Sequence, residues 1–220
     1  MIDHAPKIRV HPLAPVYAFD IDGTLGDYYE HFRWFAQLYL QKPVVADWSR
    51  ARFSGEFSDA LGLDKELYRD IKLAYRQGGM KRSLPPLDDG VSDLIQSVRG
   101  LGVQAWITTT RPWQRLDNID PDTQFWINHI VGKVDGVIYG EDKYLDLIDI
   151  VGRDRILGLV DDLPENILRA SELDLAAIMR HGAHNRQFRE MRPETLVATH
   201  SVEIYNHVRI QLEVYKEHQK

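Results

Sequence analysis

The chain has 220 residues, of which 44% are hydrophobic and 27% charged, values that argue against a disordered or fibrous protein. Its 27 basic and 33 acidic residues give a net charge of 27 − 33 = −6, which disfavours binding to polymeric nucleic acid. Cysteine is absent, so disulfides, cysteine-ligated metals and thiol catalysis are excluded. We expect a cytoplasmic protein without a membrane partner, because no apolar run approaches the ~18 residues that span a bilayer and the N-terminus lacks the apolar core of a signal peptide.

Short apolar runs alternate with helical patterns along most of the chain, which predicts an α/β fold. Runs that are apolar at nearly every position suit strands buried on both faces of a parallel sheet. Alternation of strands and helices favours parallel pairing through right-handed crossovers. We therefore expect a Rossmann-like parallel sheet flanked by helices. The predicted strands are 16–19, 103–107, 136–139, 156–160, 175–179 and 196–199, and helical patterns include 91–98, 166–170 and a segment that begins near 201.

Residues 28–85 interrupt this alternation. They contain no clear strand pattern, are rich in aromatic residues and helix formers, and end at Pro85-Pro86. We interpret them as a small helical cap inserted after the first strand, so that residues 1–27 and 86–220 form the core domain. The alternative is a missed strand that extends the core.

The segment Phe19-Asp20-Ile21-Asp22-Gly23-Thr24 carries the strongest chemical signal. Two carboxylates follow a buried strand at the end where open α/β sheets bind their ligands. Because side chains alternate along an extended chain, Asp20 and Asp22 are predicted to share one side. An acidic turn without chemistry is the simpler alternative, but the position of the pair favours function.

The ends of the next two predicted strands add phosphate-binding candidates. Thr109, Thr110 and Arg111 follow the second predicted strand, where hydroxyls, and free backbone N–H groups if a helix begins nearby, can donate to phosphate oxygens. Threonine is also common in strands, so its presence alone is weak evidence. Lys143 follows the third strand and would neutralise phosphate charge, although most lysines are simply solvated.

A second acidic pair, Asp161 and Asp162, ends the fourth predicted strand just before Pro164. Adjacent carboxylates repel one another and need a compensating cation. With Asp20 and Asp22 they would form a cluster of oxygen ligands, which favours Mg²⁺ over zinc. Alone, the pair would be read as an acidic start to a helix.

In this order the four segments resemble the motifs of the haloacid dehalogenase superfamily of phosphotransferases, over about residues 16–185. The resemblance implies that Asp20 is the nucleophile that forms an aspartyl-phosphate. It implies that Asp22 is the general acid and base and ligates Mg²⁺ through its backbone carbonyl. The aspartate that follows the nucleophile favours phosphatases over dehalogenases.

The same resemblance implies roles for the later motifs. Thr109 would bind the phosphate, Lys143 would be the cation of the third motif, and Asp162 with Asp161 would complete the metal site. Thr110 and Arg111 are predicted to contact substrate beside them.

A narrower resemblance is to the 5′(3′)-deoxyribonucleotidase family. It rests on the aromatic insertion, on Leu87-Asp88-Asp89-Gly90-Val91 and on Ala183-His184-Asn185-Arg186, while Thr24 and 108–111 depart from that family's pattern. The resemblance implies that cap aromatics hold a nucleotide base, and by position these would be Tyr28, Phe53 and Tyr75. Packing within the cap is the alternative role for the three rings.

The expected activity is thus Mg²⁺-dependent hydrolysis of a small phosphomonoester, with (deoxy)nucleoside monophosphates as the first substrate candidate. The alternatives are a 3′-phosphatase of nucleic-acid ends, a phosphatase of small metabolites, and a non-catalytic phosphate-binding module. A homodimer is left open beside a monomer.

Overall fold

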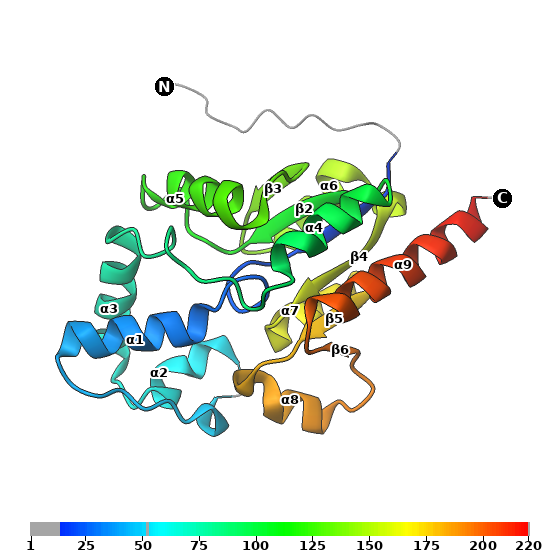
Figure 1. Cartoon of the computed structure of the whole chain (residues 1–220). Coiled ribbons are helices and arrows are strands. Elements are labelled where there is room, and N and C mark those ends of the chain that lie inside the picture. Colours follow the sequence, from blue (N-terminus) through cyan, green and yellow to red (C-terminus); the bar gives the residue numbers. More distant parts are fainter. Residues whose placement is uncertain (1–13, 52, 220) are drawn as a thin grey trace.

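The computed structural model describes residues 14–51 and 53–219 (Figure 1). Residues 1–13 of the predicted core domain, where the sequence lacks the apolar core of a signal peptide, lie outside the described residues, as does residue 52 of the predicted cap.

A six-stranded parallel sheet in the order β3-β2-β1-β4-β5-β6 forms the centre of the molecule. Its strands are β1 Val16–Phe19, β2 Gln104–Thr109, β3 Gly136–Tyr139, β4 Ile156–Asp161, β5 Ala177–Arg180 and β6 Val197–Ala198. The central strands are buried along nearly their whole length, which explains their continuous apolar runs. The predicted α/β fold and its parallel sheet are confirmed.

Helices cover both faces of the sheet (Figure 1). On one face α4 (Val91–Gly100), α5 (Ile119–Trp126) and α9 (Ser201–His218) bury residues such as Leu94, Trp126 and Val208 in the same core cluster as Tyr17 and Phe19 of β1. On the other face α6 (Lys143–Val151) and α7 (Pro164–Glu172) cover the alternate side chains of β1, β2 and β4. A short helix, α8 (Arg186–Met191), packs near β5.

The chain between β1 and β2 begins with a helical insertion. It contains α1 (Tyr28–Leu40), α2 (Phe57–Ala60) and α3 (Lys65–Gln77), and its described residues form no strand. Asp64 starts α3 by accepting a hydrogen bond from the Leu67 N–H at 2.8 Å, a side-chain cap of a free backbone donor. The insertion extends from one end of the sheet (Figure 1). The helical cap after the first strand is therefore present, while the division into two domains stays a prediction.

The register of the central strands determines which side chains meet at the sheet edge. Phe19 is aligned with Ile107 of β2 on one side and with Val160 of β4 on the other. The residues that follow, Asp20, Thr108 and Asp161, therefore emerge next to one another at the carboxyl ends of three strands. This is the edge at which open α/β sheets place their ligand sites.

Among the residues that the structure describes, no helix is both long enough and apolar enough to cross a membrane.

Candidate active site

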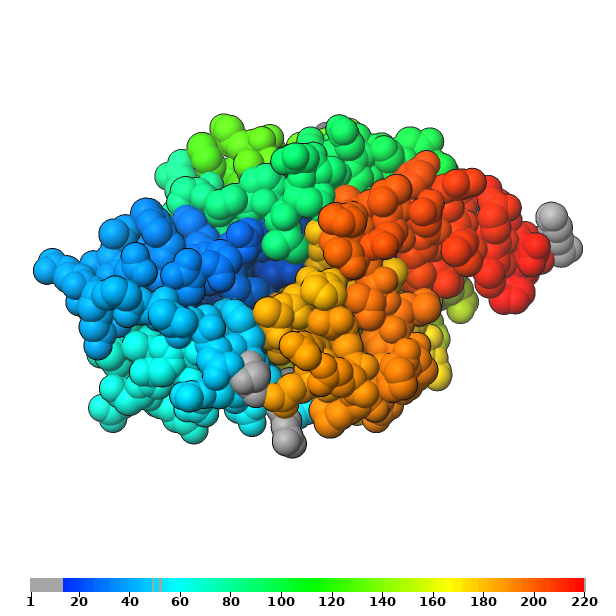
Figure 2. All heavy atoms as spheres, turned by 60° about the horizontal axis from the view of Figure 1, so that its bottom comes forward, coloured from blue at the N-terminus to red at the C-terminus, as the bar shows by residue number. Residues whose placement is uncertain are grey.

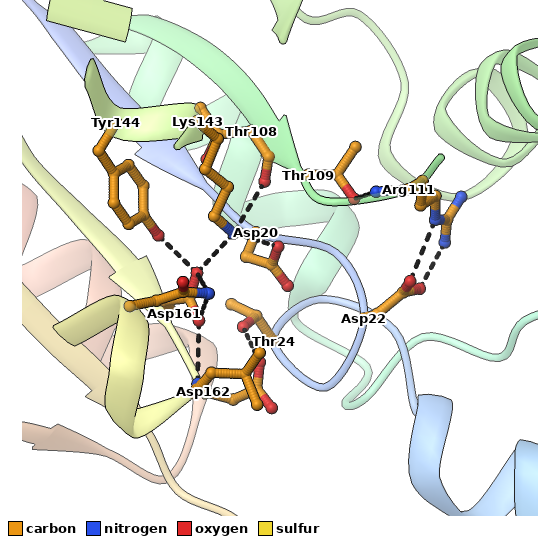
Figure 3. Close-up of polar contacts among 12 residues, drawn as sticks. Asp20, Asp22, Thr24, Thr108, Thr109, Arg111, Lys143, Tyr144, Asp161 and Asp162 are labelled. Atoms are coloured by element: carbon orange, nitrogen blue, oxygen red, sulfur yellow. Dashed lines mark hydrogen bonds and ion pairs between the residues drawn. The ribbon is translucent and has the colours of Figure 1, made fainter. Parts of the chain in front are cut away.

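Three carboxylates meet at the carboxyl edge of the sheet (Figure 3). Asp20 follows β1, Asp161 ends β4 and Asp162 follows it, and one oxygen of each lies within 4.8 Å of those of the other two. All three residues are buried. The structure thus brings together Asp20, Asp161 and Asp162 of the predicted metal site.

Lys143, the first residue of α6, lies between two of these carboxylates. Its ammonium donates to Asp20 Oδ1 at 2.5 Å, to Asp161 Oδ2 at 2.6 Å and to the Thr108 carbonyl at 3.3 Å. Burial disfavours its charge, but the carboxylates of Asp161 and Asp20 outweigh burial and raise the pKa of Lys143 above its usual value. Lys143 is therefore a permanent cation beside Asp20.

Asp161 has donors on both carboxylate oxygens. Besides Lys143, Oδ2 accepts from the Tyr144 hydroxyl at 2.5 Å, and Oδ1 accepts from the Leu163 N–H at 2.9 Å. The Asn166 side-chain amide contacts both oxygens, at 3.0 and 3.1 Å. Asp20 differs, because no donor among the described residues reaches its Oδ2. Asp161 is thus fixed in place, whereas Asp20 keeps one oxygen available for chemistry.

Asp162 lies against the helical insertion. Its Oδ1 accepts from the Thr24 hydroxyl at 3.2 Å and its Oδ2 from the Tyr29 hydroxyl of α1 at 2.5 Å. His184 Nε2 is 2.8 Å from the same Oδ2, and the His184 ring stacks on Tyr29 with centroids 3.9 Å apart. Gly23, at φ +98°, lies so close that a Cβ there would overlap the Asp162 carboxylate. A residue of the insertion therefore covers part of the acidic cluster.

The composition of the cluster fits a hard divalent cation. Three carboxylates face a single ammonium, so negative charge exceeds positive charge in a buried space. Burial raises the pKa of Asp20 well above its usual value, and repulsion from Asp161 and Asp162 adds to this effect although Lys143 opposes it. A Mg²⁺ held by Asp20 and Asp162 would supply the missing charge with the oxygen ligands it prefers.

Asp22 lies apart from this cluster, beside Arg111 (Figure 3), and contacts a second cation, Lys81. Arg111 binds it in a bidentate manner, with Nη2 to Oδ1 at 2.6 Å and Nε to Oδ2 at 3.2 Å, and Lys81 Nζ is 2.5 Å from Oδ2. Burial alone would raise the pKa of Asp22, but Arg111 and Lys81 outweigh it and hold that pKa well below its usual range. The side chains of Asp20 and Asp22 thus belong to different charge clusters.

The segment after β2 positions Arg111. Its Nη1 donates to the Thr123 hydroxyl at 3.0 Å, and its backbone N–H donates to the Thr109 hydroxyl at 3.4 Å. Thr110 is exposed, whereas the Thr108 hydroxyl is buried without a hydrogen-bond partner among the described residues. The phosphate-binding roles of Thr109 and Thr110 stay predictions, and Thr108 joins them as an unpaired donor at the same strand end.

Lys81, in the return segment after α3, was not found by sequence reasoning. Its ammonium lies 4.0 Å from the centroid of the Tyr28 ring and 5.4 Å from that of Tyr75. Burial lowers the pKa of Lys81 to about 7, with repulsion from Arg111 adding to the shift and attraction to Asp22 opposing it. No motif marks this residue, because a single lysine after a helix has no signature.

Of the three aromatic residues predicted to hold a nucleotide base, Tyr28 and Tyr75 meet, whereas Phe53 does not join them. Tyr28 and Tyr75 are buried and meet edge to face at 5.8 Å, and the Tyr75 hydroxyl is 2.8 Å from His31 Nδ1. Phe53 is 40% exposed and makes no ring contact among the described residues. Within the insertion, the hydroxyl of Tyr29, the neighbour of Tyr28, reaches the acidic cluster. The sequence therefore pointed to Tyr28, whereas its neighbour Tyr29 is the residue whose hydroxyl contacts Asp162.

No protein-family model and no curated protein sequence matches this chain. Among solved structures, a haloacid dehalogenase-like hydrolase from Streptococcus pneumoniae is similar, with 14% identity and a TM-score of 0.62, over 88% of this chain and 98% of that one. A putative phosphoglycolate phosphatase from Lactobacillus delbrueckii has 14% identity and a TM-score of 0.63, over 89% and 98%. A putative β-phosphoglucomutase from Thermotoga maritima has 16% identity and a TM-score of 0.55, also over 89% and 98%. The chain therefore has the fold of the haloacid dehalogenase-like hydrolases.

Proposed function

We propose that this protein is a Mg²⁺-dependent phosphomonoester hydrolase that forms an aspartyl-phosphate on Asp20. The observation that carries the proposal is the asymmetry of the Asp20 carboxylate, whose Oδ1 is held by Lys143 while Oδ2 has no donor among the described residues. Asp161 and Asp162 beside it support a metal site, and the fold of the similar hydrolases supports this class of reaction.

Each residue has a distinct role in the proposed reaction. Asp20 Oδ2 attacks phosphorus, and the bond from phosphorus to the ester oxygen breaks as the new bond forms. Asp22 gives a proton to the leaving oxygen and later takes one from the water that releases phosphate from Asp20. Lys143 neutralises phosphate charge, with Thr109 as a further phosphate ligand. Bound Mg²⁺, held by Asp20, Asp162 and the Asp22 carbonyl, would neutralise the negative charge of the carboxylates and the phosphate that Lys143 alone does not balance.

The substrate that we favour is a small phosphorylated metabolite. Two of the similar structures carry names that refer to phosphoglycolate and phosphoglucose chemistry, and the buried cluster under Tyr29 disfavours a polymer end. A nucleoside monophosphate is the second candidate, supported by the Tyr28 and Tyr75 rings beside Lys81. These rings are buried, so a base would reach them only after the insertion moves.

The test is phosphate release from a panel of monoesters with Mg²⁺ and with EDTA. The panel includes 2-phosphoglycolate, a sugar phosphate and a nucleoside 5′-monophosphate. We expect EDTA to abolish release, because Asp20 and Asp162 would then face the phosphate without compensation. Asp162→Ala should reproduce the EDTA result, while Asp149→Ala, at an exposed position of α6, should keep wild-type activity. Full activity in EDTA would overturn the proposal.

A further inference from the structure

Lys81, Arg111 and Asp22 form a second buried charge cluster, which we call the cation clamp. Lys81 comes from the return segment of the insertion, Arg111 from the segment after β2 and Asp22 from the segment after β1. The side chains of Lys81 and Arg111 are only 4% and 1% exposed, whereas that of Asp22 is 22% exposed. The carboxylate therefore forms the outer face of the clamp, with both cations behind it.

The clamp has more positive than negative charge. Two cations share one carboxylate, which leaves one positive charge without a partner in a buried place. Moving an unpaired charge out of water is costly unless another group compensates it. The two cations therefore attract a further anion, which can bind beside the Asp22 carboxylate or in its place.

Lys81 also has unused hydrogen-bonding capacity. Its ammonium has three N–H donors, but Asp22 Oδ2 is the one oxygen that accepts from it among the described residues. The ammonium also lies near the rings of Tyr28 and Tyr75, whose faces stabilise a cation. An aromatic face is a weaker hydrogen-bond acceptor than an oxygen, so the remaining N–H donors are not fully satisfied. Arg111 is held in place by Thr123, so it can keep its orientation when its carboxylate partner changes.

Resting on the phosphatase function proposed above, we propose that Lys81 and Arg111 bind a second anionic group, carried by the leaving portion of the substrate. A carboxylate or a second phosphate on that portion takes the place of the Asp22 carboxylate between the two cations. No covalent bond changes in this exchange. One carboxylate on the clamp is replaced by another anion, so the clamp keeps its counter-charge.

The exchange gives the clamp a part in the reaction. While Asp22 is bound by both cations, its side chain is turned away from Asp20 and therefore from the leaving oxygen. A substrate with a second anion frees Asp22 to turn toward the leaving oxygen. A substrate without that group leaves Asp22 on the clamp. Specificity for the second anion and supply of the proton are thereby linked.

The test compares esters that differ in one group. 2-Phosphoglycolate carries a carboxylate where 2-hydroxyethyl phosphate carries a hydroxymethyl group, and ethylene glycol bisphosphate carries a second phosphate there. For the wild type we expect kcat/KM for one or both anionic esters to exceed that for the hydroxyethyl ester by roughly ten- to a hundredfold, the size expected for hydrogen bonds to charged groups. Which anionic ester is preferred identifies the group that the clamp takes.

Variants locate the preference on the clamp. Lys81→Met and Lys81→Gln should each reduce the ratio of kcat/KM for the anionic ester to kcat/KM for the hydroxyethyl ester by roughly tenfold. Methionine replaces the ammonium by an apolar group and glutamine replaces it by a neutral hydrogen-bond donor. If one of the two variants does not fold, the other can still be measured. Lys42→Met, at an exposed position after α1, should keep the wild-type ratio. A ratio near one in the wild type, or an unchanged ratio in the Lys81 variants, overturns the proposal.

Calorimetry separates failure of this inference from failure of the phosphatase function. Binding of 2-phosphoglycolate and of the bisphosphate is measured on the wild type and on Lys81→Met, each carrying Asp20→Asn to prevent turnover. Weaker binding without Lys81 supports the clamp even if no ester is hydrolysed. Equal binding overturns the clamp even if all three esters are hydrolysed. Absence of phosphate release from every ester with Mg²⁺ would overturn only the phosphatase proposal.

Discussion

Two buried lysines of this molecule lie in charge clusters of opposite balance. Lys143 contacts two carboxylates, Asp20 and Asp161, and its pKa is raised. Lys81 shares the single carboxylate of Asp22 with Arg111, and burial lowers its pKa to about 7. Both side chains are almost fully buried. The number and sign of the neighbouring charges, rather than burial, therefore decide which lysine stays a permanent cation.

The two clusters have an excess of opposite charge and would therefore bind ions of opposite sign. The cluster around Lys143 has an excess of negative charge and would gain from a metal cation, while the clamp around Lys81 has an excess of positive charge and would gain from an anion. Under the proposed function, a substrate with a phosphate at the first cluster and a second anion at the other would satisfy both. The predictions below test this difference.

The largest expected effect comes from Asp20→Asn. An amide oxygen is a poor nucleophile toward phosphorus, so phosphate release should fall by about a thousandfold or more. The free energy of unfolding should stay equal to that of the wild type or rise, because the change removes one of three mutually repelling carboxylates. Phosphate release is measured with Mg²⁺, and unfolding by urea is measured in EDTA.

The outcome of this variant separates two roles for Asp20. If Asp20 only held the metal, added Mg²⁺ at high concentration should restore much of the activity of Asp20→Asn. We expect no such rescue, since the attacking oxygen itself has lost its reactivity. Wild-type-like release from this variant would contradict the aspartyl-phosphate mechanism.

The sequence predicted the sheet well because each central strand is buried on both faces. Residues 16–19 and 136–139 were predicted with the bounds that the structure has, whereas the predicted strand 103–107 begins one residue later and runs on to Thr109. Such ends depend on pairing with neighbours: β2 continues through Thr108 and Thr109 because they pair with Ile138 and Tyr139 of β3. Hydrophobic runs cannot reveal polar residues that extend a strand in this way.

The sequence also predicted the acidic cluster, because strand ends converge wherever strands are parallel. It could not predict the partners that come from the insertion. Tyr29 and Lys81 reach Asp162 and Asp22 over long separations along the chain, and their contacts depend on how α1 and the return segment pack on the core. The sequence also could not predict that the side chains of Asp20 and Asp22 lie apart, because this depends on the contacts of Asp22 with Lys81 and Arg111.

The second prediction compares Lys143→Met with Lys81→Met in stability. Lys143→Met leaves Asp20 and Asp161 buried without their cation and should cost about 3–5 kcal/mol of unfolding free energy. Lys81→Met leaves the bidentate pair of Arg111 and Asp22 intact and should cost less than about 1 kcal/mol. Urea unfolding in EDTA measures both, with unchanged slopes as evidence that the comparison is valid. Similar losses in the two variants would contradict the difference between the clusters.

A third buried base, His207, differs from both lysines because it has no ionic partner among the described residues. His207 of α9 lies against β1, with Nδ1 2.7 Å from the Tyr17 hydroxyl, which itself donates to the Leu159 carbonyl at 3.1 Å. Since that hydroxyl has only one proton to donate, His207 Nδ1 is the donor in this contact. Burial lowers the pKa of His207 from 6.5 to about 4.

The smallest expected effect is therefore a loss of stability at mildly acidic pH. The unfolded chain takes up a proton at His207 near its ordinary pKa, whereas the folded protein does so only near pH 4, so this contribution is complete above pH 6.5 and is lost as the pH falls toward 4. The loss should reach at most roughly 3 kcal/mol. His207→Leu should flatten the dependence of the unfolding free energy on pH in that window, measured by urea unfolding, while His218→Leu at the exposed end of α9 should keep the wild-type slope. Equal slopes in all three proteins would mean that His207 is protonated as readily in the folded state as in the unfolded one.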